Sequence, residues 1–332
     1  MSMLKHNDPW IGLSDAETVV GKLRLIHSLM LGHLPFVSRV AVALYDPATD
    51  YLRTFAYSSH IDSPLTHYQA PLAECRSLLE IVASRQSRVV NDLNDFNDST
   101  HEHSRVILAA GYRSSYTVPM IWEGKFFFFI FFNANEPNVF GENSLAELDV
   151  IAQLITLLIY NERSNVRTLV ATVKSALELT HSRDPETGTH LERMSRYARL
   201  IAKAMASSHS LADDYVEHIY LFAPLHDLGK LTIPDRILLK QGVLNDDEFA
   251  IMKRHAEEGR RLIDKLLENY GLRGISHVQL LRNIAMHHHE ALDGSGYPSH
   301  LAGVEIPLEA RIVTVADVFD ALTSQRPYKE AW

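Results

Sequence analysis

The second half of the chain carries a set of histidine and carboxylate side chains whose types suit a metal centre. Its members are Glu186, His190, His226, Asp227, His255, His288, His289 and Asp317. Glu186 and His190 are four residues apart, so they share one face if their segment is helical. Imidazole and carboxylate groups together suit iron, manganese, zinc or nickel better than calcium. The chemistry expected of this set is therefore that of a transition-metal site.

Each member of this set has a plainer structural interpretation when it is taken alone. A lone histidine on a helix is usually a structural residue with its hydrogen bonds satisfied, and a Glu/His pair four apart is usually a solvated helix face. The three consecutive histidines of the run His287–His289 are harder to explain in that way. A metal site needs several ligands of these types together, so their joint presence in one region favours the metal interpretation.

Four motifs in this region together resemble the HD-GYP family, a branch of the HD phosphohydrolases. The motifs are HDLGK, HHHEALDGSGYP, ADVFDAL and RPYK, and the resemblance covers residues 165–332. It implies a helical domain with metals in its middle that hydrolyses cyclic di-GMP to pGpG or GMP. It also implies two or three divalent metal ions, iron first, with manganese, zinc or nickel as alternatives.

The resemblance assigns roles residue by residue. All eight members of the set fall on metal ligands of the family, and Asp227 falls on the aspartate that bridges two metals. Glu186 falls on a ligand that only some members of the family have, which suggests a third metal. Two metals close together would neutralise a phosphodiester and lower the pKa of a water between them. We therefore expect the catalytic residues to be Asp227 and Lys230.

Contacts to the substrate are also implied by the resemblance. The expected substrate-binding residues are Lys230, Gly296, Tyr297, Arg326 and Lys329. Lys230 lies four residues after His226 and is placed to stabilise phosphate charge; its plainer interpretation is a surface lysine. The Gly-Tyr-Pro loop around Tyr297 is implied to touch the substrate and to contact diguanylate cyclase domains, although its glycines alone predict only a tight turn.

Helices must carry these residues, because the sequence from about Arg183 onward reads as helices with short loops. Residues 165–332 are therefore expected to form an all-α domain of the HD type. A long helical pattern over residues 144–180 precedes it. Its apolar residues are spaced alternately three and four apart, as in a coiled-coil seam; they are Leu148, Ile151, Ile155, Leu158, Val166, Leu169, Val173 and Ala176. The pattern predicts a dimer helix, or alternatively a core helix that continues as a linker.

The first half of the chain reads as strand pairs separated by helices. Segments 14–34 and 71–85 have helical periodicity, segments 40–45 and 51–57 form one predicted β-hairpin, and segments 114–122 and 125–132 form another. The polar segment 91–104 reads as a loop. This order predicts an antiparallel sheet with helices packed on it, and residues 1–160 resemble a GAF domain. The resemblance implies that this domain is a sensor or a dimerisation platform. The whole chain is therefore expected to be an α+β multidomain protein.

Composition narrows the class of protein. The 332 residues carry a formal net charge of -9, which disfavours binding to a nucleic-acid polymer. The single cysteine, Cys75, excludes an internal disulfide and suits the cytoplasm; its plainest role is packing. The most apolar run, Phe126–Phe132, is too short to span a membrane and reads as a buried strand.

The leading functional prediction is a cytoplasmic, homodimeric cyclic di-GMP phosphodiesterase that the GAF-like domain regulates, with dimer contacts through that domain and the connecting helix. One alternative is a catalytically weak module that binds cyclic di-GMP and signals by contact. The other is a hydrolase of another cyclic dinucleotide such as cyclic GMP-AMP.

Overall fold

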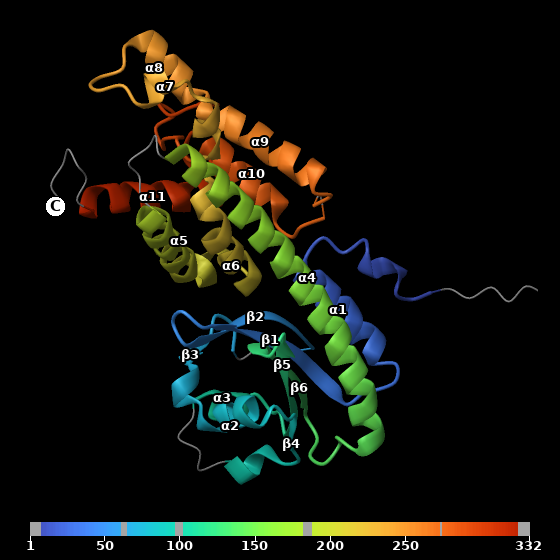
Figure 1. Cartoon of the computed structure of the whole chain (residues 1–332). Helices are drawn as coiled ribbons and strands as arrows, with labels where there is room; N and C mark the ends of the chain where they lie inside the picture. The colour runs from blue at the N-terminus through green and yellow to red at the C-terminus, as the bar shows by residue number, and fades with distance from the viewer. Residues whose placement is uncertain (1–7, 61–64, 97–101, 182–187, 273, 325–332) are drawn as a thin grey trace, which may run out of the picture. The chain divides into compact units, whose positions relative to one another are not determined.

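The computed structural model describes residues 8–60, 65–96, 102–181, 188–272 and 274–324. The chain divides into two compact units, the first made of residues 1–161 with 212–214 and the second of residues 162–211 with 215–332. The first unit contains a β-sheet and the second is helical, which confirms the α+β class (Figure 1).

A six-stranded antiparallel sheet forms the middle of the first unit. Its strands are β1 (Val37–Asp46), β2 (Tyr51–Ser59), β3 (Gln69–Pro71), β4 (Arg88–Val90), β5 (Ser114–Trp122) and β6 (Lys125–Ala134). Their order across the sheet is β3-β2-β1-β6-β5-β4. The two predicted hairpins, β1–β2 and β5–β6, are confirmed and lie side by side because β1 also pairs with β6. The apolar run in β6 is a buried central strand, as predicted, with Phe129 and Ile130 fully buried.

Helices cover both faces of this sheet (Figure 1). Helices α1 (Val19–Met30) and α4 (Glu142–His181) share one hydrophobic core with β1 and β6. Helix α2 (Arg76–Ser84) packs on the other face, where it buries Cys75 with its neighbours. Helix α3 (Glu102–Ala109) also lies on that face, in a small cluster with β4. The expectation of a loop throughout segment 91–104 was wrong, because α3 and a short 3-10 turn at Leu93–Phe96 lie partly within it.

The long helix α4 buries the apolar residues that the sequence suggested as a dimer seam. Leu148, Ile155, Val166, Leu169 and Val173 are each at most 2% exposed, because the cores of the two units cover them. The seam interpretation is therefore wrong for these residues. The core-helix alternative is confirmed for the part that packs on the sheet, whereas the part predicted to be a linker packs into the core of the second unit. The side chain of Ala176 lies outside the described residues. By length and composition alone, the part of α4 from Glu142 to Val173 could cross a membrane, but this buried stripe is that of a core helix.

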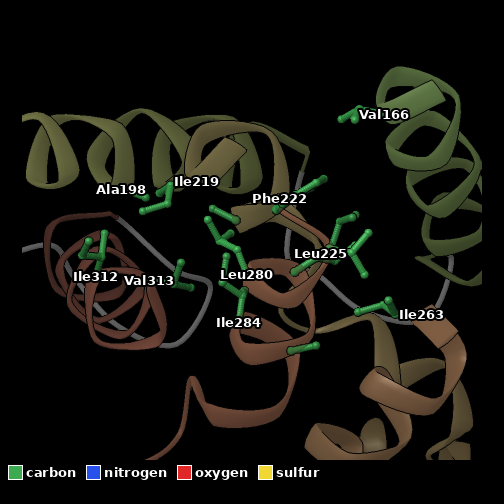
Figure 2. Close-up of a cluster of buried hydrophobic side chains, with 14 of the residues drawn as sticks. Val166, Ala198, Ile219, Phe222, Leu225, Ile263, Leu280, Ile284, Ile312 and Val313 are labelled. Carbon is green, nitrogen blue, oxygen red and sulfur yellow. The ribbon is translucent and has the colours of Figure 1, made fainter. Parts of the chain in front are cut away.

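The second unit is a set of helices around one apolar core (Figure 2). Besides the end of α4, its helices are α5 (Gly188–His209), α6 (Asp213–Phe222), α7 (Asp235–Leu238), α8 (Asp246–Lys253), α9 (His255–Asn269), α10 (Val278–His287) and α11 (Leu308–Thr323). Two 3-10 turns, η4 (Ala223–Leu225) and η5 (Leu228–Thr232), follow α6, and a third, η6 (Gly303–Glu305), precedes α11. Leu225, the last residue of η4, belongs to this core together with Phe222 and Ile284. The core thereby fixes the segment that holds His226 and Asp227.

Candidate metal centre

The turn between η4 and η5 places His226 and Asp227 in the interior. Gly229 makes this possible, because η5 lies directly against the start of α9. A Cβ atom at position 229 would lie 1.8 Å from the His255 carbonyl oxygen and 2.5 Å from the Gly259 nitrogen. Only glycine fits such an approach of two backbones. The glycine of the HDLGK motif therefore brings Asp227 to the first residue of α9, which is His255.

Asp227 and three histidines around it form the first ligand group, made of Asp227, His255, His288 and His289. One ligand atom from each residue lies within 4.8 Å of the others. The Asp227 Oδ1 atom is 3.4 Å from His255 Nε2 and 3.7 Å from His288 Nε2, and these two nitrogens are 3.3 Å apart. The group unites the HD turn, the start of α9 and the end of α10.

A second ligand group adjoins the first and contains His190 from α5, His226, and Asp317 from α11. Its ligand atoms also lie within 4.8 Å of one another, with His190 Nε2 3.6 Å from Asp317 Oδ1. The groups meet at the HD motif, where His226 Nε2 is 3.1 Å from Asp227 Oδ2. The structure thus brings together all seven predicted ligands that lie among the described residues.

Three of the histidines are held by one ring nitrogen, which leaves the other directed at the ligand groups. The Nδ1 atom of His226 is 2.9 Å from the Ala223 carbonyl oxygen, and that of His255 is 2.7 Å from the Met252 carbonyl oxygen. His288 Nδ1 lies 3.0 Å from the Ile284 carbonyl oxygen. A carbonyl accepts only, so Nδ1 must carry the proton and Nε2 is the free ligand atom.

His190 is held differently, by a carboxylate. Its Nδ1 atom lies 2.6 Å from Oδ2 of Asp320, which is 1% exposed. Arg193 donates to both oxygens of the same carboxylate, at 2.7 and 3.0 Å. Neither Asp320 nor Arg193 was among the residues predicted from the sequence. A signal was present, because Asp320 follows Asp317 by three residues and Arg193 follows His190 by three, so each pair shares a helix face.

Three buried atoms at the meeting point of the two groups have no hydrogen-bond partner among the described residues. They are His190 Nε2, His226 Nε2 and Asp227 Oδ1. Leaving buried polar atoms unsatisfied costs stability, so native structures rarely do it without a reason. Nitrogen and carboxylate lone pairs that converge in a buried place fit a divalent transition metal. The residues present therefore fit the metal centre that the sequence predicts.

The electrostatics of the first group favour neutral histidines. Burial lowers the pKa of His255 to about 4 and that of His289 to about 2, so both rings are neutral at physiological pH, as metal ligands must be. In the second group, burial also opposes charge on His226, but the Asp227 carboxylate outweighs it and raises the His226 pKa to about 9, so this ring must give up its Nε2 proton when it binds a metal. Burial would also raise the pKa of Asp227, yet Lys230 and His226 hold it well below its usual range. Asp227 is thus an anion in the folded protein.

Lys230 and Tyr297 border the first group. The Lys230 Nζ atom is 2.8 Å from Asp227 Oδ2, and the lysine side chain remains 24% exposed. The ring of Tyr297 stacks on His289, with centroids 4.8 Å apart and planes 30° apart. The Tyr297 amide donates to the His289 carbonyl at 3.2 Å. Both predicted substrate contacts therefore lie at the edge of the ligand groups.

The loop that carries Tyr297 is anchored by Glu290, which stands directly after the ligands His288 and His289. The Glu290 carboxylate accepts hydrogen bonds from the Ser299 amide at 2.7 Å and from the Leu301 amide at 3.1 Å. Gly296 packs against it, since a Cβ there would lie 2.3 Å from the Ala291 nitrogen. Gly296 thus has a backbone packing role, and its expected contact with substrate stays a prediction. Glu186, Arg326 and Lys329 lie outside the described residues.

Comparison with known proteins relates the helical unit to one family. Residues 172–332 match the family model described as HD domain. The cyclic di-GMP phosphodiesterase response regulator RpfG of Xanthomonas campestris is 50% identical over 150 residues, which cover 45% of this chain and 37% of that protein. A cyclic di-GMP phosphodiesterase of Thermotoga maritima is 46% identical over 151 residues, covering 46% and 38% of the two chains.

A third relative, the 3'3'-cGAMP-specific phosphodiesterase 2 of Vibrio cholerae, is 35% identical over 220 residues, covering 61% of this chain and 40% of that protein. The chain thus spans about two fifths of the length of these relatives.

Solved structures similar to part of the chain include the GAF domain/HD domain protein from Geobacter sulfurreducens. It has a TM-score of 0.36 and 16% identity, and the match covers 45% of this chain and 95% of that one. A phycoerythrobilin-bound GAF domain from a cyanobacterial phytochrome has a TM-score of 0.33 and 17% identity, covering 45% and 86%. The HD dyad at His226 and Asp227 lies within residues 172–332, the part of this chain that matches the HD domain family.

Proposed function

We propose that this protein is a metal-dependent phosphodiesterase of the HD-GYP type that hydrolyses cyclic di-GMP to pGpG, GMP or both. The observation that carries the proposal is the pair of adjoining ligand groups, which meet at His226 and Asp227 and contain three buried atoms unsatisfied by any described residue. A hydrolase of anionic diesters needs concentrated positive charge, and this acidic chain would obtain it from metal ions held there.

Two divalent ions held by these groups would supply Lewis acidity and an activated water for attack at phosphorus. The side chains around them have separate tasks. Asp227 belongs to the first group through Oδ1 and faces His226 of the second group through Oδ2, so its carboxylate would help to hold both ions. Lys230 presents an ammonium beside Asp227 and stabilises charge on the phosphate. Tyr297 offers a ring face and a hydroxyl at the rim, where substrate would enter.

The substrate assignment rests on the names of the relatives. Two of the relatives described above are cyclic di-GMP phosphodiesterases and match at 50% and 46% identity, which favours cyclic di-GMP. A second candidate substrate is 3'3'-cGAMP, because the phosphodiesterase named for it matches over a longer stretch of 220 residues. Competition between the two dinucleotides for one preparation of the protein separates these candidates.

The metal we propose is iron, with manganese, zinc or nickel as the alternatives that the same ligands accept. Glu186 would contribute to a third ion if the centre is trinuclear. A Glu186→Ala variant should then keep the central pair of metals and lose only the third. An unchanged metal content in that variant would favour a centre of two ions.

We further propose that the first unit regulates the enzyme as a GAF-like sensor in a cytoplasmic homodimer. The exposed face of α4 supports a dimer, because Val150 is 71% exposed and Leu157, two helical turns later, is 53% exposed. The Gly-Tyr-Pro loop is the proposed contact for diguanylate cyclase domains, with Leu292 68% exposed and Val304 87% exposed on the chain around it. The buried single cysteine suits a reducing compartment.

The test is to measure metal content and cyclic di-GMP turnover on one anaerobically purified sample of the full chain. We expect two or three metal ions per chain and linear product. His226→Ala and Asp227→Ala should each abolish turnover and lower metal content while the sheet of the first unit keeps its circular dichroism. Full activity in both variants would refute the metal mechanism. Metal without turnover would favour the weak cyclic di-GMP-binding module instead.

A further inference from the structure

We propose that Asp320, held by Arg193, is a positioning residue that sets the metal affinity of the second ligand group separately from that of the first. The second group is the one made of His190, His226 and Asp317. This inference rests on the proposed metal-dependent function, and it concerns a residue that does not belong to either ligand group.

The Asp320 carboxylate is enclosed and fully engaged. Its side chain is 1% exposed, Oδ2 lies 2.6 Å from His190 Nδ1, and both oxygens accept from Arg193. The Ser324 hydroxyl donates to Oδ1 at 3.3 Å. Such a carboxylate cannot turn toward a metal without breaking several hydrogen bonds at once. It therefore acts on the centre through His190, whose ring it orients and whose Nε2 it directs toward Asp317.

The two ligand groups differ in the partners of their histidine Nδ1 atoms. The Nδ1 atoms of His226, His255 and His288 all lie beside neutral backbone carbonyls. Among the described histidine ligands with a recorded Nδ1 partner, His190 alone has an anionic one. A carboxylate partner raises the basicity of a ligand imidazole more than a carbonyl does, and outer partners of this kind typically change metal affinity by about 10–100-fold. The second group thus owes part of its affinity to a charge that the first group lacks.

The same contacts also tie two helices together, so a purely structural role must be distinguished. His190 and Arg193 lie on α5 and Asp320 lies on α11, and an ion pair between helices could simply stabilise packing. Packing alone predicts that loss of the carboxylate lowers thermal stability and disturbs every ligand equally. Positioning predicts a loss confined to one group and transmitted only through His190.

The chain offers a matched control for this test. Arg282 on α10 donates through Nε to Asp264 on α9 at 2.7 Å, the same distance at which Arg193 Nε donates to Asp320. Neither Arg282 nor Asp264 belongs to a ligand group. Asp264→Asn therefore makes the same carboxylate-to-amide change in an interhelical pair, away from the metal ligands.

The experiment is calorimetric titration of the metal-free full chain with Mn²⁺. We expect wild type and Asp264→Asn to bind the same number of ions, at least two per chain, with the same affinities. In Asp320→Asn, one binding event should weaken by about 10–100-fold while the other keeps its affinity. Combining Asp320→Asn with His190→Ala should add nothing to the loss caused by His190→Ala alone, because the two residues act in series.

Four results would contradict either the positioning role of Asp320 or the proposed metal-dependent function. Unchanged binding in Asp320→Asn, an equal loss in both events, or an additive loss in the double variant would each overturn the positioning role. Wild type that binds no Mn²⁺ would overturn the proposed function instead. If Asp320→Asn does not fold, Arg193→Met is the substitute, because that side chain is 39% exposed. It should weaken the same single event, and unchanged binding there would equally overturn the role.

Discussion

A histidine binds a metal well when one ring nitrogen is held and the other is left bare. Three of the ligands obtain this arrangement from the chain just before them. His226 follows the 3-10 turn η4, His255 follows α8, and His288 follows α10. The last carbonyls of a helix lack partners within that helix. His255 and His288 each take up a carbonyl of this kind, three or four residues earlier. His226 uses the Ala223 carbonyl at the start of η4, which also accepts from the His226 amide. The free nitrogen of each ring is thereby aimed at the centre.

At the residue scale, Lys230 provides a test of catalysis that is separate from metal binding. We expect Lys230→Met to lower kcat by about 10²–10³-fold, because one charge-stabilising donor is removed from the transition state. Metal content should stay at the wild-type value, since Lys230 belongs to neither ligand group. The measurements are steady-state hydrolysis and metal analysis on the same sample.

The control for that variant is Lys240→Met, because Lys240 pairs with Glu248 and belongs to neither ligand group. It should hydrolyse substrate at the wild-type rate. A Lys230→Met enzyme with unchanged kcat would remove the lysine from the mechanism, and one that loses metal would make its role structural.

At the scale of elements, the close contact between η5 and α9 is the feature on which the first ligand group depends. Gly229→Ala must push η5 away from α9, because the new Cβ would overlap the His255 carbonyl oxygen at 1.8 Å. We expect a loss of about 1–3 kcal/mol in the free energy of unfolding, typical of an overpacked interior. Metal affinity should also fall, since Asp227 and His255 are separated. Chemical denaturation and metal titration measure the two effects.

Gly274→Ala is the matched control, since a Cβ at position 274 meets no atom within 4 Å. Gly274→Ala should leave the free energy of unfolding and the metal affinity unchanged. Equal behaviour of the two alanine variants would mean that the approach of η5 to α9 is not required.

Helix α4 is joined to the HD domain by a buried carboxylate whose effect depends on pH. Glu162 is 6% exposed and accepts from the Ser276 amide at 2.6 Å. Burial would raise its pKa, but His218 and Ser276 lower it below the ordinary value of 4.5. A lowered pKa in the folded state means stability that is present above pH 4.5 and is lost as the pH falls through the folded pKa.

Glu162→Gln should therefore destabilise the chain by about 1.5–3 kcal/mol at pH 7, the range for a hydrogen bond to a charged group. The difference from wild type should shrink as the pH is lowered from 5 to 3. Thermal unfolding followed across this range measures it. A difference that does not change with pH would mean that the charge of Glu162 contributes nothing.

The main elements could be predicted from the sequence, but not the short or polar ones. Hairpins and long helices have apolar periodicity, which is visible locally. Strands β3 and β4 have three residues each, too few for a period, and pairing with a neighbouring strand determines them. Helix α3 lies in a stretch rich in Asn, Asp and His, and it exists because Ile107 is buried in a small cluster. Tertiary packing decides such elements, and local propensity cannot predict them.

The metal ligands could be predicted from the motifs and from residue type, whereas the residues that support those ligands could not. Asp320, Arg193 and Glu290 act through contacts between segments that are far apart in sequence or fold back as loops. The distance from His190 to Asp320 along the chain is 130 residues, so no local pattern could pair them.

For the whole molecule, the exposed stripe on α4 predicts how copies of the chain associate. If Val150 and Leu157 form a homodimer contact, the double variant Val150→Glu and Leu157→Glu should weaken the dimer by at least about tenfold, or 1.4 kcal/mol. The introduced carboxylates would lie close to those of the other subunit and would lose hydration in the interface, and both effects oppose association. Sedimentation velocity over a range of concentrations measures this change.

Val243→Glu is the control, because Val243 is 91% exposed and lies off α4. It should leave the association unchanged. A double variant that sediments like wild type would place the dimer contact elsewhere, and a monomeric wild type would remove the dimer from the proposal.

Gly296 shows that positions around the centre differ in how many substitutions they can accept over evolutionary time. Most exposed positions there accept many side chains, since surface substitutions usually change stability little. Position 296 does not, because any larger residue would place its Cβ 2.5 Å from the Glu290 Cα atom. A library of all single substitutions should therefore be depleted at 296 as strongly as at the histidine ligands. Selection for activity would thus protect a backbone position that itself touches neither metal nor proton.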